Sequence, residues 1–334
     1  MIAPPQNSPF AQIGQPSGPI SALTTIEQTG QRLDSLLAAL YPSFSRSSLN
    51  HAVKAGRVTV DGKPVKPSLI VKAGQEIVFF PPPPPTPLAW TGAEPPYAKL
   101  FEDQNILIIN KPMGLVTHPG QAVAEPTLLD ALLAFYPELS EIESPHRPGI
   151  VHRLDKDTTG VMAIAKNSHA QAFLIQAFAD RKVKKRYLAF VSGHPPKSGL
   201  IDSPIGRHPT LRHKMAAGSP LGVPARTFYR VLKRFPKVGV SLLSINLFTG
   251  RTHQARVHLS SLKFPIIGDK VYGPQKSSLL RNFPSLEPYA RRQLLHARSL
   301  SVPLPQGGRR RFSAPWPPDF LSFFNELSKI EKKP

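Results

Sequence analysis

Apolar residues recur with a helical period near the start of the chain. From residue 31 to 42, leucines fall at i, i+3, i+4 and i+7, which predicts a helix with one buried face. These leucines are Leu33, Leu36, Leu37 and Leu40. A second helix is predicted over residues 46–56, with Ser45 as its N-cap. Two strands are predicted to follow, at residues 57–65 around an Asp-Gly turn and at residues 74–80.

The pattern beyond residue 96 is dominated by strands. Apolar and polar residues alternate in many short stretches, which predicts strands within 99–114, 161–165, 181–193, 225–235, 239–250 and 294–317. Helical patterns are fewer, within 127–137, 168–179 and 251–264 and after residue 317, and residues 200–225 are expected to form a basic loop. Since many strands are joined as hairpins, we predict an α+β fold whose mostly antiparallel mixed β-sheet has flanking helices.

Composition shifts divide the chain into four parts. Residues 1–22 are rich in Pro, Gln, Ser and Gly and are predicted to be a disordered tail. Residues 23–80 form a small α/β domain, and consecutive prolines make residues 81–96 a semi-rigid linker. Residues 97–334 form the second, larger domain.

The charge of the chain indicates a polyanionic partner. Its 42 basic and 21 acidic side chains give a formal net charge of +21, which binding to phosphates would offset by releasing counterions. A basic but inert surface and a membrane surface are the alternatives. No apolar run approaches the roughly 20 residues of a spanning helix, so no membrane partner is expected. Because cysteine is absent, disulfides and thiolate nucleophiles are excluded, and we expect a cytoplasmic protein.

The stretch from Gly149 to Gly160 carries the densest candidate chemistry, because it places five charged or titratable residues among apolar ones. On a strand, His152 would share one face with Leu154, and Arg153 would share the other with Asp155. Such charges are costly unless they pair or react. The motif by itself leaves open whether Asp155 is a catalytic carboxylate or a member of a structural ion pair.

Two further stretches are weaker candidates. Tyr187 lies two residues after Lys185 on a predicted strand, where an aromatic ring beside a cation suits stacking on a base, although core packing is the commoner role. Arg256 lies in a predicted helix and needs a carboxylate partner if it is buried. His253 and His258 have poor spacing for a shared metal, and no acidic residue accompanies them, so no metal site is expected.

Residues 31–65 are similar to an S4 RNA-binding domain. The similarity rests on the sequence RLD at the start of the first helix, SRS before the second, and GRVTVDG after it. The resemblance implies that the two helices bind the phosphate backbone of structured RNA. We assign this role to Arg46, Lys54 and Arg57.

The larger domain resembles the RluA-type RNA pseudouridine synthases, which isomerise uridine to pseudouridine. The ordered motifs are NKPMGLVTHP, RPGIVHRLDKDTTG, KKRYLAFVSG, GRTHQARVHL with PIIGDKVYG, and LLHARSL, and they cover residues 97–318. Departures from the family pattern are Ala255 and an insertion at residues 274–293. With an S4 domain in front, the chain looks most like the bacterial synthases that modify the large ribosomal subunit.

The resemblance implies a role for each matching residue. Asp155 matches the catalytic aspartate, Tyr187 the tyrosine that stacks on the target base, and Arg256 the arginine that pairs with the aspartate. Arg153 matches a residue that holds the space of the flipped nucleotide. We add His152 and Arg251 as RNA contacts.

The predicted protein is therefore a monomeric RNA pseudouridine synthase that needs no metal or cofactor. Large-subunit ribosomal RNA is the expected substrate. The alternatives are a synthase acting on transfer RNA and a non-catalytic RNA-binding ribosome-assembly factor. The sequence does not decide whether Asp155 attacks the sugar, attacks the base or acts as a base.

Overall fold

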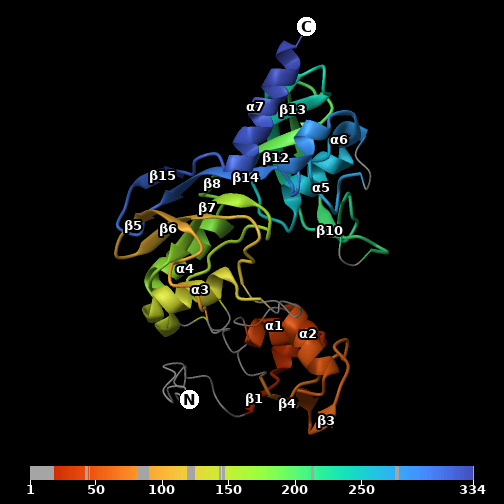
Figure 1. Cartoon of the computed structure of the whole chain (residues 1–334). Helices are drawn as coiled ribbons and strands as arrows, with labels where there is room; N and C mark the ends of the chain where they lie inside the picture. Colours follow the sequence, from red (N-terminus) through yellow and green to blue (C-terminus); the bar gives the residue numbers. More distant parts are fainter. Residues whose placement is uncertain are drawn as a thin grey trace, which may run out of the picture. The chain divides into compact units, whose positions relative to one another are not determined.

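The chain divides into two compact units, each with its own hydrophobic core (Figure 1). In this computed structural model, residues 1–87 and 140–148 make up the first unit, and residues 88–139 and 149–334 the second. The structure describes residues 19–41, 44, 46–81, 90–118, 125–142, 144, 147–211, 214–274 and 278–333, without the side chains of residues 46 and 47. Within these residues, no helix is long and apolar enough to cross a membrane.

The first unit contains the two predicted helices, α1 (Leu33–Leu40) and α2 (Arg46–Lys54). The predicted apolar faces are confirmed, because the side chains of α1 and α2 that point inward are almost fully buried. They are Leu33, Leu36, Leu37, Leu49, Ala52 and Val53. The predicted N-cap Ser45 lies outside the described residues.

A four-stranded antiparallel sheet completes the first unit, in the order β1-β4-β2-β3. Its strands are β1 (Ile20–Leu23), β2 (Val58–Val60), β3 (Lys63–Pro64) and β4 (Glu76–Phe79), and a short 3-10 helix, η2 (Ile26–Gln28), follows β1. The predicted turn lies at Asp61 and Gly62, both with positive φ. Residues 20–22 belong to β1 rather than to a disordered tail. Four residues are too short a stretch for a reliable periodicity, and β1 is fixed by pairing with β4.

The second unit is built on a nine-stranded sheet with the order β5-β6-β7-β14-β8-β13-β12-β9, and β15 pairs with β14. Its strands are β5 (Ala98–Glu102), β6 (Ile106–Lys111), β7 (Thr159–Ala165), β8 (Lys184–Ser192), β9 (Ser198–Asp202), β12 (Arg226–Phe235), β13 (Val240–Leu247), β14 (Leu295–Pro303) and β15 (Arg309–Ser313). Every pairing is antiparallel except that of β7 with β14. The predicted mixed, mostly antiparallel sheet with flanking helices is confirmed.

Helices cover both faces of this sheet. They are α3 (Leu128–Phe135), α4 (Ser168–Ala179), α5 (Gln254–Ser261), α6 (Ser278–Asn282) and α7 (Pro318–Lys332), with 3-10 helices η3 (Pro137–Glu141) and η4 (Pro284–Tyr289). Helix α4 packs on the face that carries Leu300, and α7 packs on the face that carries Leu188 and Phe190. Figure 1 shows α4 and α7 on opposite sides of the strands.

Three local predictions in the second unit are wrong. Residues 151–155 form an irregular loop rather than a strand edge. The expected basic loop at 200–225 contains a hairpin of β10 (Ile205–Arg207) and β11 (Met215–Ala217), because backbone pairing overrides its Pro- and Gly-rich composition. Asn167 rather than Ser168 caps α4, and its side chain accepts a hydrogen bond from the Ala170 N–H.

Candidate active site

Asp155 lies in a loop that leaves the sheet after Ile150 and returns to it as β7 at Thr159. The loop is closed by a hydrogen bond from the Thr158 N–H to the Asp155 carbonyl, at 3.0 Å. Just beyond it, Gly160 passes so close to β14 that a Cβ would lie 2.3 Å from the Ala297 carbonyl oxygen. Only glycine fits this contact, which fixes where the loop re-enters the sheet.

Two side chains that the sequence analysis did not single out hold the loop on either side of Asp155. Thr117 donates its hydroxyl to the Leu154 carbonyl at 2.9 Å, and Lys111 donates its ammonium to the Lys156 carbonyl at 2.9 Å. Lys111 is fully buried and also donates to the two carbonyls at residues 112 and 115. Burial lowers the pKa of Lys111 to about 7, although the nearby carboxylates oppose this shift. The carbonyls before and after Asp155 therefore have fixed partners.

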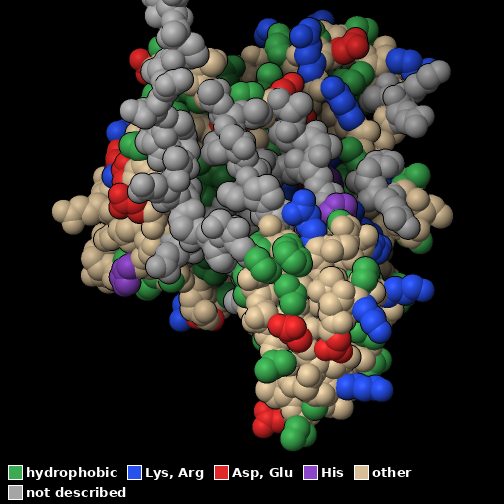
Figure 2. Space-filling view, turned by 90° about the horizontal axis from the view of Figure 1, so that it is seen from below, with side chains coloured by type: hydrophobic (Ala, Val, Ile, Leu, Met, Phe, Trp, Pro, Cys, Tyr) green, Lys and Arg blue, Asp and Glu red, His purple; other side chains and the backbone are tan. Residues whose placement is uncertain are grey.

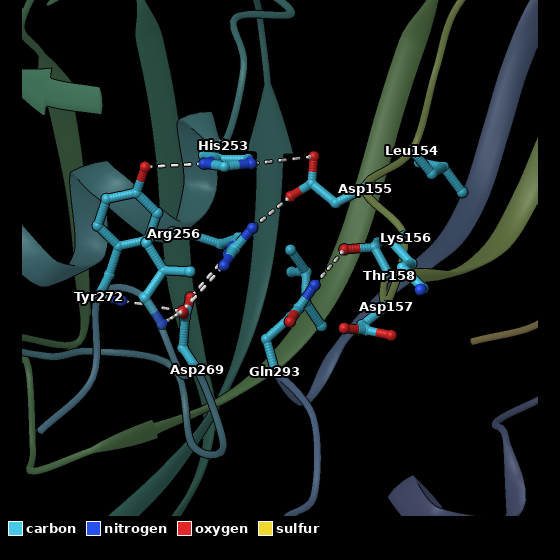
Figure 3. A network of polar contacts seen from close by, with 12 residues as sticks. Leu154, Asp155, Lys156, Asp157, Thr158, His253, Arg256, Asp269, Tyr272 and Gln293 are labelled. Atoms are coloured by element: carbon cyan, nitrogen blue, oxygen red, sulfur yellow. Dashed lines mark hydrogen bonds and ion pairs between the residues drawn. The ribbon is translucent and has the colours of Figure 1, made fainter. Parts of the chain in front are cut away.

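One guanidinium joins Asp155 to a second carboxylate. The Arg256 Nη1 donates to Asp155 Oδ2 at 3.0 Å, while Nε and Nη2 bind Asp269 through both its oxygens, at 2.7 and 2.9 Å. Figure 3 shows Arg256 between the two acids. The side chain of Asp269 has no exposed surface, that of Arg256 is 5% exposed, and that of Asp155 is 19% exposed. Of the two acids, Asp155 is the one within reach of a ligand.

Asp269 is kept ionised although it is buried. Burial would raise the pKa of Asp269, but Arg256 and the N–H groups of Val271 and Tyr272 lower it overall. Burial likewise works against the charge of Arg256, yet Asp269 and Asp155 raise its pKa above the ordinary value. The three charged groups therefore stabilise one another away from water.

A histidine faces the other oxygen of Asp155. His253 caps α5 in the left-handed region, with φ of 57°, an unusual conformation that is typical of functional sites. Its Nδ1 lies 2.8 Å from the Tyr272 hydroxyl, which already accepts a hydrogen bond from the Met215 N–H at 2.9 Å. The hydroxyl can also donate to Nδ1; in that tautomer the proton of the ring is on Nε2, which lies 4.0 Å from Asp155 Oδ1 (Figure 3). Burial lowers the pKa of His253 and keeps the ring neutral.

A cavity of about 400 Å³ opens in front of Asp155. Strand alternation directs Lys185 and Tyr187 of β8 into it, as the sequence predicted for a shared face. Burial, and then the charge of Asp155, raise the pKa of Tyr187, so its hydroxyl stays protonated at neutral pH. Lys185 donates to the Thr249 carbonyl at 2.8 Å, and burial lowers its pKa to about 8. The volume lies in the range of sites that bind small organic groups.

The remaining predicted contacts in the second unit lie around the cavity. Arg153 and Arg251 are exposed and line it. His152 also lines the cavity, but its Nε2 accepts a hydrogen bond from the Ala163 N–H at 2.9 Å, and its ring stacks on Phe178. Burial lowers the pKa of His152 to about 3. His152 can therefore contact a ligand only as a neutral ring.

The predicted contacts in the first unit are partly described. Lys54 ends α2 and Arg57 precedes β2, and both side chains are exposed. The side chain of Arg46 lies outside the described part. On the face seen from below, Figure 2 shows basic side chains at several separate places.

Sequence reasoning missed Asp269, His253 and Tyr272 as parts of the site. Asp269 lies in the motif PIIGDKVYG, to which the sequence analysis gave no catalytic role. One signal in the sequence could have identified Asp269. It is an acid that closely follows the apolar pair Ile266 and Ile267, and a buried Arg256 needs a carboxylate partner. No group of three or more potential metal ligands occurs in the part of the chain that the structure describes.

Comparison with known proteins identifies the family. Residues 105–261 match the model for RNA pseudouridylate synthase, and residues 31–77 match the S4 domain. A protein of Yersinia pestis named Ribosomal large subunit pseudouridine synthase D is 40% identical over 319 residues, which are 92% of this chain and 94% of that protein. The chain belongs to the RNA pseudouridine synthase family. It is an isomerase that acts on RNA.

Two further similarities extend across the catalytic domain of this synthase. A Chloroflexus aurantiacus protein named Uncharacterized RNA pseudouridine synthase is 44% identical over 90% of this chain and 91% of its own length. The solved structure of Human RNA Pseudouridylate Synthase Domain Containing 4 superimposes with a TM-score of 0.56 and 31% identity, over 69% of this chain and 93% of that one. The similarity therefore holds in sequence and in fold.

Proposed function

We propose that this synthase isomerises uridines in large-subunit ribosomal RNA and that Asp155 is its catalytic carboxylate. The catalytic assignment rests on a difference between the two carboxylate oxygens of Asp155. Asp155 lines the cavity, and Arg256 binds its Oδ2 at 3.0 Å, whereas Oδ1 has no hydrogen bond among the described residues and lies 4.0 Å from His253 Nε2. Oδ1 is therefore the oxygen available to a substrate.

The reaction breaks the bond from uracil N1 to ribose C1′ and forms one from C5 to C1′. The C5 proton is lost and N1 gains a proton, so no oxidant or reductant is needed. An ionised carboxylate serves attack on the sugar carbon, attack on the ring and proton abstraction alike. Arg256 holds Asp155 in place in each case, because its Nη1 donates to Oδ2 at 3.0 Å.

The cavity takes a single flipped nucleotide in this proposal. A base inside a duplex cannot reach Asp155, so it must leave the stack. Tyr187 supplies a ring for the flipped base, and its protonated hydroxyl can donate a hydrogen bond to it. Arg153 and Arg251, exposed beside the cavity, bind the neighbouring phosphates, and His152 contacts the nucleotide through its neutral ring.

The S4 domain docks the RNA in this account, with Arg46, Lys54 and Arg57 on phosphates. The first domain begins before residue 23, because β1 starts at Ile20. The extent 97–334 of the second domain, the monomeric state and the cytoplasmic location remain predictions. Ribosomal RNA is proposed because the Yersinia pestis relative, which aligns with 92% of this chain, is named for the large ribosomal subunit.

Substrate choice is tested with purified protein and RNA transcripts. Protein-free transcripts of large-subunit ribosomal RNA, small-subunit ribosomal RNA and pooled transfer RNAs are incubated with the enzyme, and pseudouridine is mapped by carbodiimide labelling. The proposal expects modification at defined sites of the large-subunit transcript only. Modification confined to transfer RNA would overturn the ribosomal assignment.

A further inference from the structure

The sheet of the second unit has a face that points away from the catalytic cavity. On β8, Lys185 and Tyr187 point into the cavity, so Lys184, Arg186 and Leu188 point to the opposite side. Helix α7 covers this opposite side around Leu188. The part that carries Lys184 and Arg186 is exposed.

Strand register shows which residues share this exposed part. Directly paired residues of antiparallel strands lie on the same face. One row across the sheet therefore contains Arg311, Ser301 and Lys184. The next contains Ser313, Ser299, Arg186, Asn246 and Phe228, and the third contains Leu188, Ser244 and Arg230. Arg309 pairs with Pro303, so it lies on the same face one row beyond Arg311. We call the five exposed cations Lys184, Arg186, Arg230, Arg309 and Arg311 the basic sheet face.

Hydroxyl and carbonyl groups hold three of these arginines in place. Arg186 donates its Nε to the Ser244 hydroxyl at 2.9 Å, and Arg311 donates its Nη2 to the Ser299 hydroxyl at 3.2 Å. Arg309 donates to the Ser301 carbonyl at 3.2 Å. Side chains that are already ordered lose less entropy when they bind a ligand.

The basic sheet face lacks balancing acids. None of its five cations has an ion pair within the described chain. The strands β8, β12, β13, β14 and β15 contain no Asp or Glu. Ordinary surface arginines alternate with acids, so an acid-free array of ordered guanidiniums points to an external anion.

We propose that the basic sheet face is a second RNA-binding surface that grips the phosphate backbone of the substrate away from the target uridine. The five cations and their serine partners offer charged and neutral donors, as phosphate contacts require. The surface raises the affinity for RNA but does not recognise particular bases. This inference rests on RNA being the ligand of the synthase.

Neighbouring arginines on β15 allow a closely matched test. Arg309 and Arg311 belong to the basic sheet face, whereas Arg310 lies between them and stacks on Phe101, 4.1 Å from its ring centroid. The variants are R309Q/R311Q, the charge-preserving R309K/R311K, and R310Q as control. Binding of each full-length protein to a protein-free large-subunit ribosomal RNA transcript is measured from 50 to 300 mM KCl.

The double Gln variant is expected to bind RNA about 10- to 30-fold more weakly at 150 mM salt. The salt slope, which is the slope of log binding constant against log salt concentration, should be smaller by about 1.4 to 1.8, because each lost phosphate contact lowers its magnitude by roughly 0.7 to 0.9. R309K/R311K keeps most of the slope, and R310Q matches the wild type. Wild-type affinity and salt slope in R309Q/R311Q would overturn the inference, and an acidic protein would then be the expected partner of this face. Binding needs no catalysis, so a transcript that stays unmodified counts against the proposed substrate and not against this surface.

Discussion

Replacing Asp269 by Asn tests whether the second carboxylate positions the first. Asn has nearly the same shape, but it removes the charge that meets Arg256 through two hydrogen bonds of 2.7 and 2.9 Å. Breaking a buried ion pair by removing one partner costs about 3 to 5 kcal/mol. Because Arg256 keeps Asp155 as a partner, we expect the lower end, about 3 kcal/mol, and a fall in Tm of about 6 to 12 °C.

The same change is expected to slow the reaction. Without Asp269, the guanidinium of Arg256 is free to shift toward Asp155, and a displacement of about 1 Å can cost roughly 100-fold in rate. We therefore expect kcat to fall about 100-fold while KM for RNA stays near the wild-type value, because Asp269 is buried and does not reach the substrate. Single-turnover pseudouridine formation with saturating transcript measures this effect.

Glu102 provides the control. It pairs with Lys166 and Lys99 at 2.5 and 2.7 Å, and none of these three residues lines the catalytic cavity. Glu102→Gln should lower Tm while leaving the single-turnover rate within about twofold. The reasoning fails if Asp269→Asn keeps the wild-type rate, or if both variants slow the reaction equally.

Three further predictions address the surroundings of Asp155. Tyr272→Phe removes only the hydroxyl that orients His253, and we expect a five- to tenfold lower rate with unchanged RNA affinity; an unchanged rate and pH profile would exclude this role. Thr117→Val leaves the Leu154 carbonyl without its donor and should cost about 1 to 3 kcal/mol by thermal denaturation, with a slower reaction. Burial lowers the pKa of His152 from 6.5 to about 3, so only the unfolded chain gains a proton as pH falls between these values. Stability should therefore drop between pH 6.5 and 3, and His152→Gln should reduce the drop in Tm.

The pairing of Asp155 with Arg256 could be predicted from the sequence only through the resemblance. The two residues are 101 positions apart, and no local pattern connects a loop with a distant helix. The structure places their side chains 3.0 Å apart. Asp269 was missed because its role depends on packing of the turn after Ile267 against α5, which local periodicity does not report.

The loop around Asp155 shows where pattern analysis fails. Alternation of polar and apolar residues predicted a strand edge at residues 151–155, but the backbone there is irregular. Its carbonyls are satisfied by side chains of Lys111 and Thr117 rather than by a neighbouring strand. By contrast, the helices and strands with long apolar repeats formed as predicted, because burial of one face fixes them.

The catalytic assignment of Asp155 is tested most directly by single-turnover pseudouridine formation with Asp155→Asn and Asp157→Asn. Both variants remove one carboxylate from the same loop, but Asp157 does not line the cavity. The account predicts that Asp155→Asn binds the large-subunit transcript normally and makes no pseudouridine, while Asp157→Asn retains activity. Pseudouridine formation by Asp155→Asn at the wild-type rate would contradict the account.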